Sequence, residues 1–190
     1  MSLVKATLGF IAAAMLAACT SKTVSFREEV DLPSGSRIVI EKSITYERYC
    51  ESFNCGWGDP RHVLRLPYGS ASGEAVWDER LLPIYAELRS AKEGAAREEW
   101  IVVATPRSCE DYRATDRPVP PYFEFVHMSG SNWKRVPLEA RLLNREANLA
   151  VNINPGYPPR GTLSIEEKRT LARTASPMHL NIRANAAKIC

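Results

Sequence analysis

Apolar and polar residues alternate along much of the chain, and a period of two predicts β-strands. In residues 24–30 the apolar side chains share one face, which Glu28 interrupts. In residues 37–46 the corresponding face is interrupted by Lys42. The segment between them, residues 31–36, has the sequence DLPSGS and is rich in turn-forming residues. Together the three segments predict a β-hairpin.

Further short apolar runs predict strands over residues 62–66, 81–88, 100–104, 121–128, 133–138, 148–153 and 178–183. The run WIVVA, residues 100–104, is apolar at every position, which is typical of a central strand buried on both faces. Pro83 lacks an amide hydrogen and therefore favours an edge strand or the beginning of a strand. Residues 47–60 are irregular in pattern and rich in Gly and Asp, so they predict a loop.

One segment near the C-terminus has the features of a helix. Ser164 and Glu167 form an S-x-x-E capping box, and Pro177 ends the element. The chain thus predicts roughly eight strands, hairpin connections, no βαβ alternation and one C-terminal helix. We therefore expect a mainly β fold: a single antiparallel sandwich or a partly open barrel.

The first residues differ in character from the rest of the chain. A single cation, Lys5, precedes an uncharged, mostly apolar run over residues 6–16. This run is shorter than the about 20 residues of a membrane-spanning helix. A charged start, a short apolar run and a small-residue exit are the parts of a secretory signal peptide. The exit, LAAC at residues 16–19, resembles the lipobox of bacterial lipoproteins.

This resemblance implies cleavage before Cys19, a thioether-linked lipid on its sulfur and acylation of the new amino terminus. Residues 1–18 would then be the signal peptide, 19–23 a lipidated tether and 24–190 a β-rich globular domain. Burial contributes about 0.8 kcal/mol per CH₂, so several acyl chains form a durable anchor. The other interpretation is a buried helix that contains a cysteine by chance.

The residues after Cys19 indicate whether the lipid is held in the inner or the outer membrane. Lipoproteins with Asp at this point tend to stay at the inner membrane, whereas this chain has Thr20 and Ser21. The resemblance therefore implies lipid anchoring in the outer membrane of a bacterial cell envelope, facing the periplasm.

Assigning Cys19 to lipid changes the meaning of the other cysteines. The chain has five cysteines in all, so an even number is left: Cys50, Cys55, Cys109 and Cys190. An even set in an exported domain predicts disulfides. Of the three possible pairings we favour Cys50–Cys55 as a local staple together with Cys109–Cys190 as a long tie. The spacing in CESFNC and the lack of a second close pair argue against zinc.

Charge and short motifs exclude several classes of function. A formal net charge of +3 is too close to neutral to indicate a nucleic-acid partner. The loop GSASG has Ala71 where a nucleophile elbow needs serine, and GWGDPR lacks the last glycine of a dinucleotide loop. His62, His127 and His179 are far apart in the sequence, so we assign no metal site and no cofactor.

Acidic residues adjoin one another at Glu28/Glu29, Asp78/Glu79 and Glu110/Asp111. A glycosidase needs two carboxyl groups about 5–9.5 Å apart across a cleft. Neighbours on a strand point to opposite faces, so adjacency does not supply this geometry. We therefore assign no catalytic residue from the sequence.

Aromatic residues in rigid loops give the most usable hint of function. Tyr122 and Tyr157 stand beside proline turns, and Trp57 lies between two glycines. Such rings can present stacking surfaces for sugars or docking points for proteins, or can plug the ends of the β-structure. We expect a non-catalytic binding or assembly module for an envelope protein or glycan. A hydrolase of cell-wall or glycan substrates is the alternative.

The role of Cys19 can be tested directly. We expect Cys19→Ser to abolish incorporation of labelled fatty acid, because the thioether acceptor is removed. The protein should then be released or should accumulate as an uncleaved precursor on a gel. Labelling that persists in this variant would contradict the lipidation.

Overall fold

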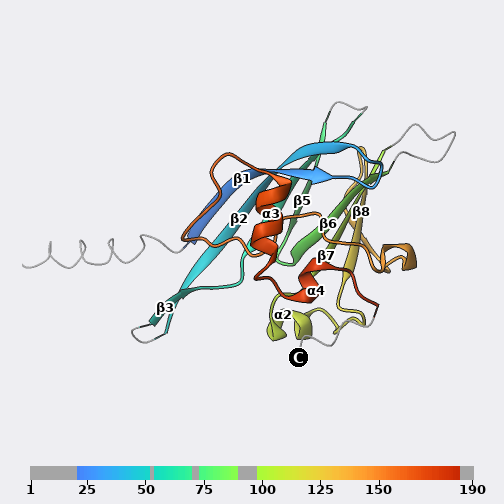
Figure 1. Ribbon diagram of the computed structural model, residues 1–190. Coiled ribbons are helices and arrows are strands. Elements are labelled where there is room, and N and C mark those ends of the chain that lie inside the picture. Colours follow the sequence, from blue (N-terminus) through green and yellow to red (C-terminus); the bar gives the residue numbers. More distant parts are fainter. Residues whose placement is uncertain (1–20, 52–53, 70–72, 90–97, 185–190) are drawn as a thin grey trace, which may run out of the picture.

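Two β-sheets pack face to face in the computed structural model of the protein (Figure 1), which describes residues 21–51, 54–69, 73–89 and 98–184. The first sheet contains β1 (Ser21–Asp31), β2 (Arg37–Glu51), β3 (Asn54–Trp57), β4 (Arg61–Pro67), β5 (Glu74–Glu79) and β10 (Thr162–Leu163). The second contains β6 (Leu82–Arg89), β7 (Glu99–Thr105), β8 (Phe123–Met128) and β9 (Lys134–Val136).

The strand order makes the fold an open sandwich and not a closed barrel. It is β10-β1-β2-β4-β5 in the first sheet, with β3 paired to β2, and β6-β7-β8-β9 in the second. All pairs are antiparallel except the short β1–β10 pair. The predicted mainly β class is confirmed, and the sandwich is the correct one of its two forms.

The predicted β1–β2 hairpin is present and is long. Its register runs from Ser21 opposite Glu47 to Asp31 opposite Arg37. Gly35 closes the turn with a φ of +85°, a conformation that costs a glycine little. Ser21–Thr23, expected as part of the tether, already belong to β1 because they pair with β2.

The main core lies between the two sheets. Trp77 of β5 meets Phe125 of β8 edge to face, with ring centroids 5.6 Å apart. Leu64 and Leu66 from β4 and Trp100 from β7 are fully buried in the same cluster. β7 lies between β6 and β8 with Trp100–Ala104 all buried, so the predicted central strand is confirmed.

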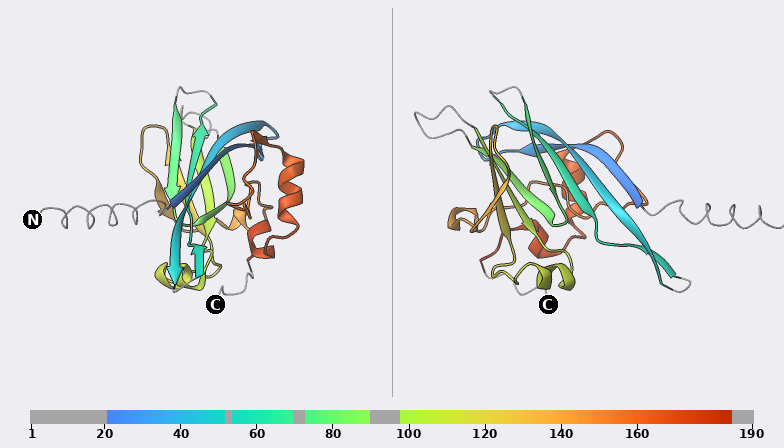
Figure 2. Two further views of the ribbon diagram at one scale, coloured as in Figure 1. Left: turned by 90° about the vertical axis from the view of Figure 1, so that its left-hand side faces the viewer. Right: turned by 180° about the vertical axis from the view of Figure 1, so that it is seen from behind.

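A third layer, formed by the chain after β9, covers the outer face of the second sheet (Figure 2). It also covers the part of β1 and β2 that contains Phe26 and Ile44. It contains η2 (Ala140–Leu142), α3 (Ile165–Ala172) and α4 (Pro177–Leu180). The predicted capping box of α3 is present, with the side chains of Ser164 and Glu167 bonding each other's backbone amides. A further short helix, α2 (Cys109–Ala114), follows β7.

Three sequence predictions in these regions were wrong. Residues 47–60 form no simple loop, because β2 extends to Glu51 and pairs with β3. Pro177 begins α4 where a strand over 178–183 was expected, since proline suits the first turn of a helix. Residues 148–153 form no strand, although Leu149, Ala150 and Val151 are buried, and Asn152 has a positive φ of 61°.

The Asn148 and Leu149 amides both donate to one carbonyl of β6, that of Ile84, and side chains bind much of the remaining backbone of residues 148–151, so this segment forms no strand ladder. The Ala150 amide donates to Glu28 Oε2 (2.6 Å), and the Ala150 carbonyl accepts from Lys42 Nζ (2.7 Å). The Asn148 carbonyl accepts from Lys168 Nζ at 2.5 Å. The segment is therefore held by charged groups on β1, β2 and α3.

These charged groups form a buried cluster of one carboxylate and two ammonium groups. Glu28 lies 3.8 Å from Lys42 Nζ and 3.6 Å from Lys168 Nζ, and the Glu28 and Lys42 side chains are fully buried. Loss of water lowers the pKa of both lysines, and the charge of Glu28 opposes this shift. Glu28 and Lys42, which interrupt the apolar faces in the sequence, thus compensate each other in the structure.

We expect Glu28→Gln to lower the free energy of unfolding by about 3–5 kcal/mol, because two buried ammonium groups lose their counter-charge. Urea denaturation measures this change. The control Glu41→Gln lies on the exposed face of β2 and should change stability by less than about 0.5 kcal/mol. Lys42→Met should lower the free energy of unfolding by less in the Glu28→Gln background than in the native protein. If the effects of the two substitutions simply add, the interaction between Glu28 and Lys42 is contradicted.

His62 is a second buried polar group in the core region. It is fully buried, and within the described part of the chain neither ring nitrogen has a hydrogen-bond partner. Burial lowers its pKa well below the ordinary value, and the charges of Lys42 and Arg107 act in the same direction. His62 is therefore neutral in the folded protein at neutral pH.

This lowered pKa predicts how stability depends on pH. The unfolded chain takes up a proton on His62 below about pH 6.5, whereas the folded protein resists it. Stability should be full above that pH and should fall as the pH drops towards the folded pKa, by at most about 1.4 kcal/mol per pH unit. His62→Phe should reduce the slope of the stability–pH curve, and the slope that remains comes in part from His127 and His179, whose pKa values burial also lowers. The control His179→Gln should retain most of the slope, and equal slopes in His62→Phe and native protein would contradict the assignment.

Candidate functional site

A groove of about 760 Å³ lies where the end of β5, helix α2 and the β8–β9 hairpin meet. We call it the acidic groove. Its lining residues come from well-separated parts of the chain and are Glu47, Asp59, Glu79, Arg80, Leu81, Glu110, Asp111, Ala114, Thr115, Phe125, Trp133 and Arg135. Five of these carry carboxylates and two carry guanidinium groups, so the groove is negative on balance.

One wall of the acidic groove is helix α2. Ser108 caps this helix and accepts a hydrogen bond from the Asp111 amide at 3.1 Å. Acidic residues in a first helical turn are favoured by the exposed amides there, which explains the placement of Glu110 and Asp111. At the other end Thr115 Oγ1 donates to the Asp111 carbonyl at 2.7 Å. The local sequence thus fixes both acids on this wall.

The carboxylates of the groove are only partly compensated. Partial burial and the neighbouring charge of Asp78 raise the pKa of Glu79, although Arg61 and Arg135 oppose this shift. Asp111 Oδ2 is buried, and no described residue forms a hydrogen bond with it. These two acids therefore have negative charge that a cationic ligand would stabilise.

The two arginines of the groove are already engaged. Arg80 lies 3.7 Å from Glu47. Arg135 is then the one arginine among the described lining residues that could compensate the other four acids of the groove. The guanidinium of Arg135 stacks over the Phe123 ring at 4.8 Å from its centroid. Neither arginine neutralises the α2 wall through a contact that we observe among the described residues.

The groove also has fixed aromatic side chains. The Trp133 indole donates to the Val76 carbonyl at 2.7 Å and lies 5.0 Å from the His127 ring. His127 in turn bonds Tyr68 Oη through Nδ1 at 2.5 Å. Phe125 is held against the core by Trp77. The half-buried Trp133 ring is therefore a preorganised surface for a ligand, whereas Phe125 belongs to the core.

A second cavity, of about 500 Å³, lies where the third layer meets the β-sandwich. Its lining includes Tyr85 from β6, Lys168 and Arg169 from α3, and Leu149 from the segment that the buried cluster holds. Lys168 Nζ is bonded to the Glu29 and Asn148 carbonyls. Because Lys168 binds these backbone carbonyls, we interpret the cavity as a gap between two packed layers and not as a ligand site.

The aromatic residues predicted as binding residues do not line the acidic groove. Tyr122 is only 3% exposed, and its hydroxyl donates to the Asn181 carbonyl at 3.0 Å. Trp57 is 42% exposed and meets Tyr46 edge to face, and Tyr157 is 85% exposed. The structure thus brings Tyr122 into the core and leaves Trp57 and Tyr157 on the surface.

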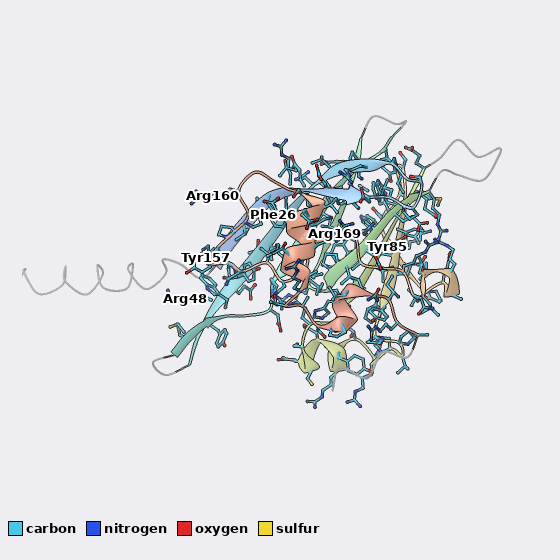
Figure 3. All side chains as sticks on the ribbon, viewed as in Figure 1. Phe26, Arg48, Tyr85, Tyr157, Arg160 and Arg169 are labelled. Carbon is cyan, nitrogen blue, oxygen red and sulfur yellow. A yellow bond between two sulfur atoms is a disulfide. The ribbon has the colours of Figure 1, made fainter. Side chains whose placement is uncertain are left out.

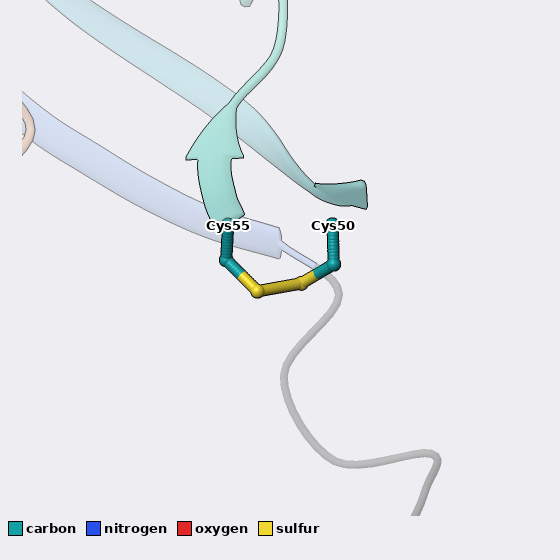
Figure 4. Close-up of a disulfide and its surroundings, with 2 residues drawn as sticks. All are labelled: Cys50 and Cys55. Atoms are coloured by element: carbon teal, nitrogen blue, oxygen red, sulfur yellow. A yellow bond between two sulfur atoms is a disulfide. The ribbon is translucent and has the colours of Figure 1, made fainter. Parts of the chain in front are cut away.

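The predicted staple between Cys50 and Cys55 is confirmed (Figure 4), and it joins residues directly opposite each other on β2 and β3. Cys109 is also disulfide-bonded. Its predicted partner Cys190 lies outside the described residues, so this pairing stays a prediction. The lipidation residue Cys19 likewise lies outside them.

Sequence reasoning missed the acidic groove, although it had noted two of its acidic pairs. Glu79 and Asp111 belong to the pairs Asp78/Glu79 and Glu110/Asp111, from which we assigned no catalytic residue because adjacency alone does not bring two carboxyl groups together across a cleft. Adjacent acids were thus a signal of the site. What the sequence lacked was any indication that the end of β5 faces α2.

Fold and site together define an open β-sandwich protein with an acidic, aromatic groove at one end. In the described ranges, no group of three His, Cys, Asp or Glu side chains is placed to hold a metal ion. Nor is any helix of those ranges long and apolar enough to cross a membrane. Comparison with protein-family models, with curated proteins and with solved structures gives no match.

Proposed function

We propose that this protein is a lipid-anchored module of the bacterial cell envelope that binds a basic segment of a partner protein in the acidic groove. The observation that carries the proposal is the charge imbalance of the groove, five carboxylates against two guanidinium groups. The anchor rests on the lipobox resemblance around Cys19.

The chemistry of the groove favours a positively charged ligand with apolar stretches. The four acids not paired with Arg80 are Asp59, Glu79, Glu110 and Asp111, and they would attract lysine or arginine side chains. The half-buried ring of Trp133 offers area for the stems of those side chains. A salt-sensitive association is expected, because exposed charges are screened over about 8 Å at physiological ionic strength.

A hydrolase of glycan or cell-wall substrates is the second candidate, and one observation favours it. Glu79 has a raised pKa, as a general acid requires, and Asp111 lines the same groove. Yet Glu79 itself is solvent-exposed at the end of β5. Binding is the better-supported function because electrostatic attraction tolerates such exposure, whereas general acid catalysis depends on an enclosed, precisely held acid.

Site-specific photo-crosslinking tests the binding proposal in the native envelope. A benzophenone amino acid at Ala114, an exposed residue of the groove wall, should crosslink to one protein partner in stoichiometric yield. The same group at Val76, on the exposed outer face of β5, is the matched control and should give little product. Glu79→Gln with Asp111→Asn should reduce the Ala114 product at least about tenfold.

The outcomes separate the two candidates. Equal crosslinking from Ala114 and Val76, or none from either, would contradict a partner in the groove. Turnover of purified peptidoglycan that Glu79→Gln abolishes would establish the hydrolase instead. The charge control Glu41→Gln, on the opposite face of the first sheet, should leave both readouts unchanged.

A further inference from the structure

The folded domain begins very close to the expected lipid anchor. β1 starts at Ser21, and Cys19 precedes it by only two residues. Two residues span at most about 7 Å even when fully extended. If Cys19 carries lipid, as the proposed function holds, the start of β1 must therefore lie at the surface of the bilayer.

The strand register shows which residues share this end of the molecule. Ser21 pairs with Glu47, so the rest of β2 and its partner β3 extend beyond the start of β1. Lys22 Nζ donates to the Pro155 carbonyl, which places the loop before β10 beside the same strand. Figure 3 shows the labelled residues Arg48, Tyr157 and Arg160 gathered at this end.

Exposed aromatic side chains concentrate here. Tyr49 is 56%, Trp57 42% and Tyr157 85% exposed. The other exposed large apolar side chains among the described residues are aliphatic and lie elsewhere on the fold, at Val39, Val76, Val119 and Met128. We call Arg48, Tyr49, Trp57, Tyr157 and Arg160 the membrane end.

The part of the membrane end formed by β2 and β3 is rigid. The Cys50–Cys55 disulfide closes the hairpin, and the Gly58 amide donates to the Glu47 carbonyl at 2.7 Å. Tyr46 holds Trp57 edge to face and donates its own hydroxyl to the Ile153 carbonyl at 2.8 Å. The hairpin and the loop that carries Tyr157 are thus tied to one strand.

The composition of this end matches the headgroup region of a lipid bilayer. Trp and Tyr are enriched at membrane interfaces because each ring has an apolar body and a polar tip. Arg48 and Arg160 add positive charge that anionic lipids attract, and Glu47, which is exposed opposite Ser21, offsets one of these two charges. A glycan or a protein could also contact exposed rings, but the nearness of Ser21 to Cys19 places a bilayer at this surface.

We propose that the membrane end docks into the headgroup region of the bilayer that holds the Cys19 lipid, so that the domain lies in a fixed orientation on the membrane. This inference rests on the proposed anchor. It adds that the lipid is not a free tether and that Trp57 and Tyr157 contact lipid.

Fluorescence quenching of the full-length, lipidated protein tests the docking. The protein is reconstituted into vesicles of phosphatidylethanolamine and phosphatidylglycerol with bromines near the headgroup end of the acyl chains. Trp77 and Trp100 are fully buried, so quenching should come mainly from Trp57. We expect Trp57→Phe to remove most of the quenching and the matched control Trp133→Phe, in the acidic groove, to preserve it.

Charge reversal provides an independent measurement. Arg48→Glu with Arg160→Glu should lower the ratio of docked to undocked protein on anionic vesicles. We expect at least about a fivefold decrease of this ratio for each residue. The control pair Lys134→Glu with Arg173→Glu changes the net charge equally at exposed sites on β9 and after α3, and should leave quenching unchanged.

Flotation with the vesicles distinguishes the two ways of failing. Protein that floats with the vesicles while Trp57 stays unquenched would overturn the docking and leave the anchor intact. Full-length protein that does not float would overturn the anchor and this inference with it.

Discussion

The buried cluster of Glu28, Lys42 and Lys168 is the interaction on which the rest of the structure depends. It joins β1 and β2 of the first sheet to helix α3 and, through the backbone of Asn148 and Ala150, to the segment that covers the sandwich. Buried charges are costly unless they are paired and hydrogen-bonded, so this cluster tolerates few alternative arrangements of the third layer. The position of the C-terminal layer follows from that requirement.

With the layers fixed, one end of the first sheet carries two neighbouring surfaces of different chemistry, because β2 and β5 are both antiparallel to β4 and end on the same side. Glu79 at the end of β5 contributes to the acidic groove, whereas the end of β2 carries the aromatic and basic membrane end. Glu47 lines the groove and Arg48 follows it directly in the chain. On the proposed orientation the groove therefore opens beside the bilayer, where it would meet a basic segment of a partner at the same membrane.

Much of the fold could be predicted from the pattern of residues, and the exceptions have physical reasons. Alternation identified the β1–β2 hairpin and β8–β9, the capping box identified α3, and the all-apolar run identified β7. β3 and β10 were missed because very short strands depend on their neighbours for stability, and β5 was missed although Ala75 and Trp77 alternate as in a half-buried strand. Residues 148–153 have the alternation of a strand, yet charged side chains bind their backbone.

The sequence by itself determined the β1–β2 hairpin, the central strand β7, the Cys50–Cys55 staple, and the expectation of an anchor at Cys19, because each of these depends on residues close together in the chain. Tertiary structure alone decided that Glu28 meets Lys168, that Glu79 shares a groove with Asp111, and that Tyr157 lies beside β1. Local periodicity specifies which face of an element is buried. Local periodicity does not specify which distant element will cover that face. The packing of the layers decides this.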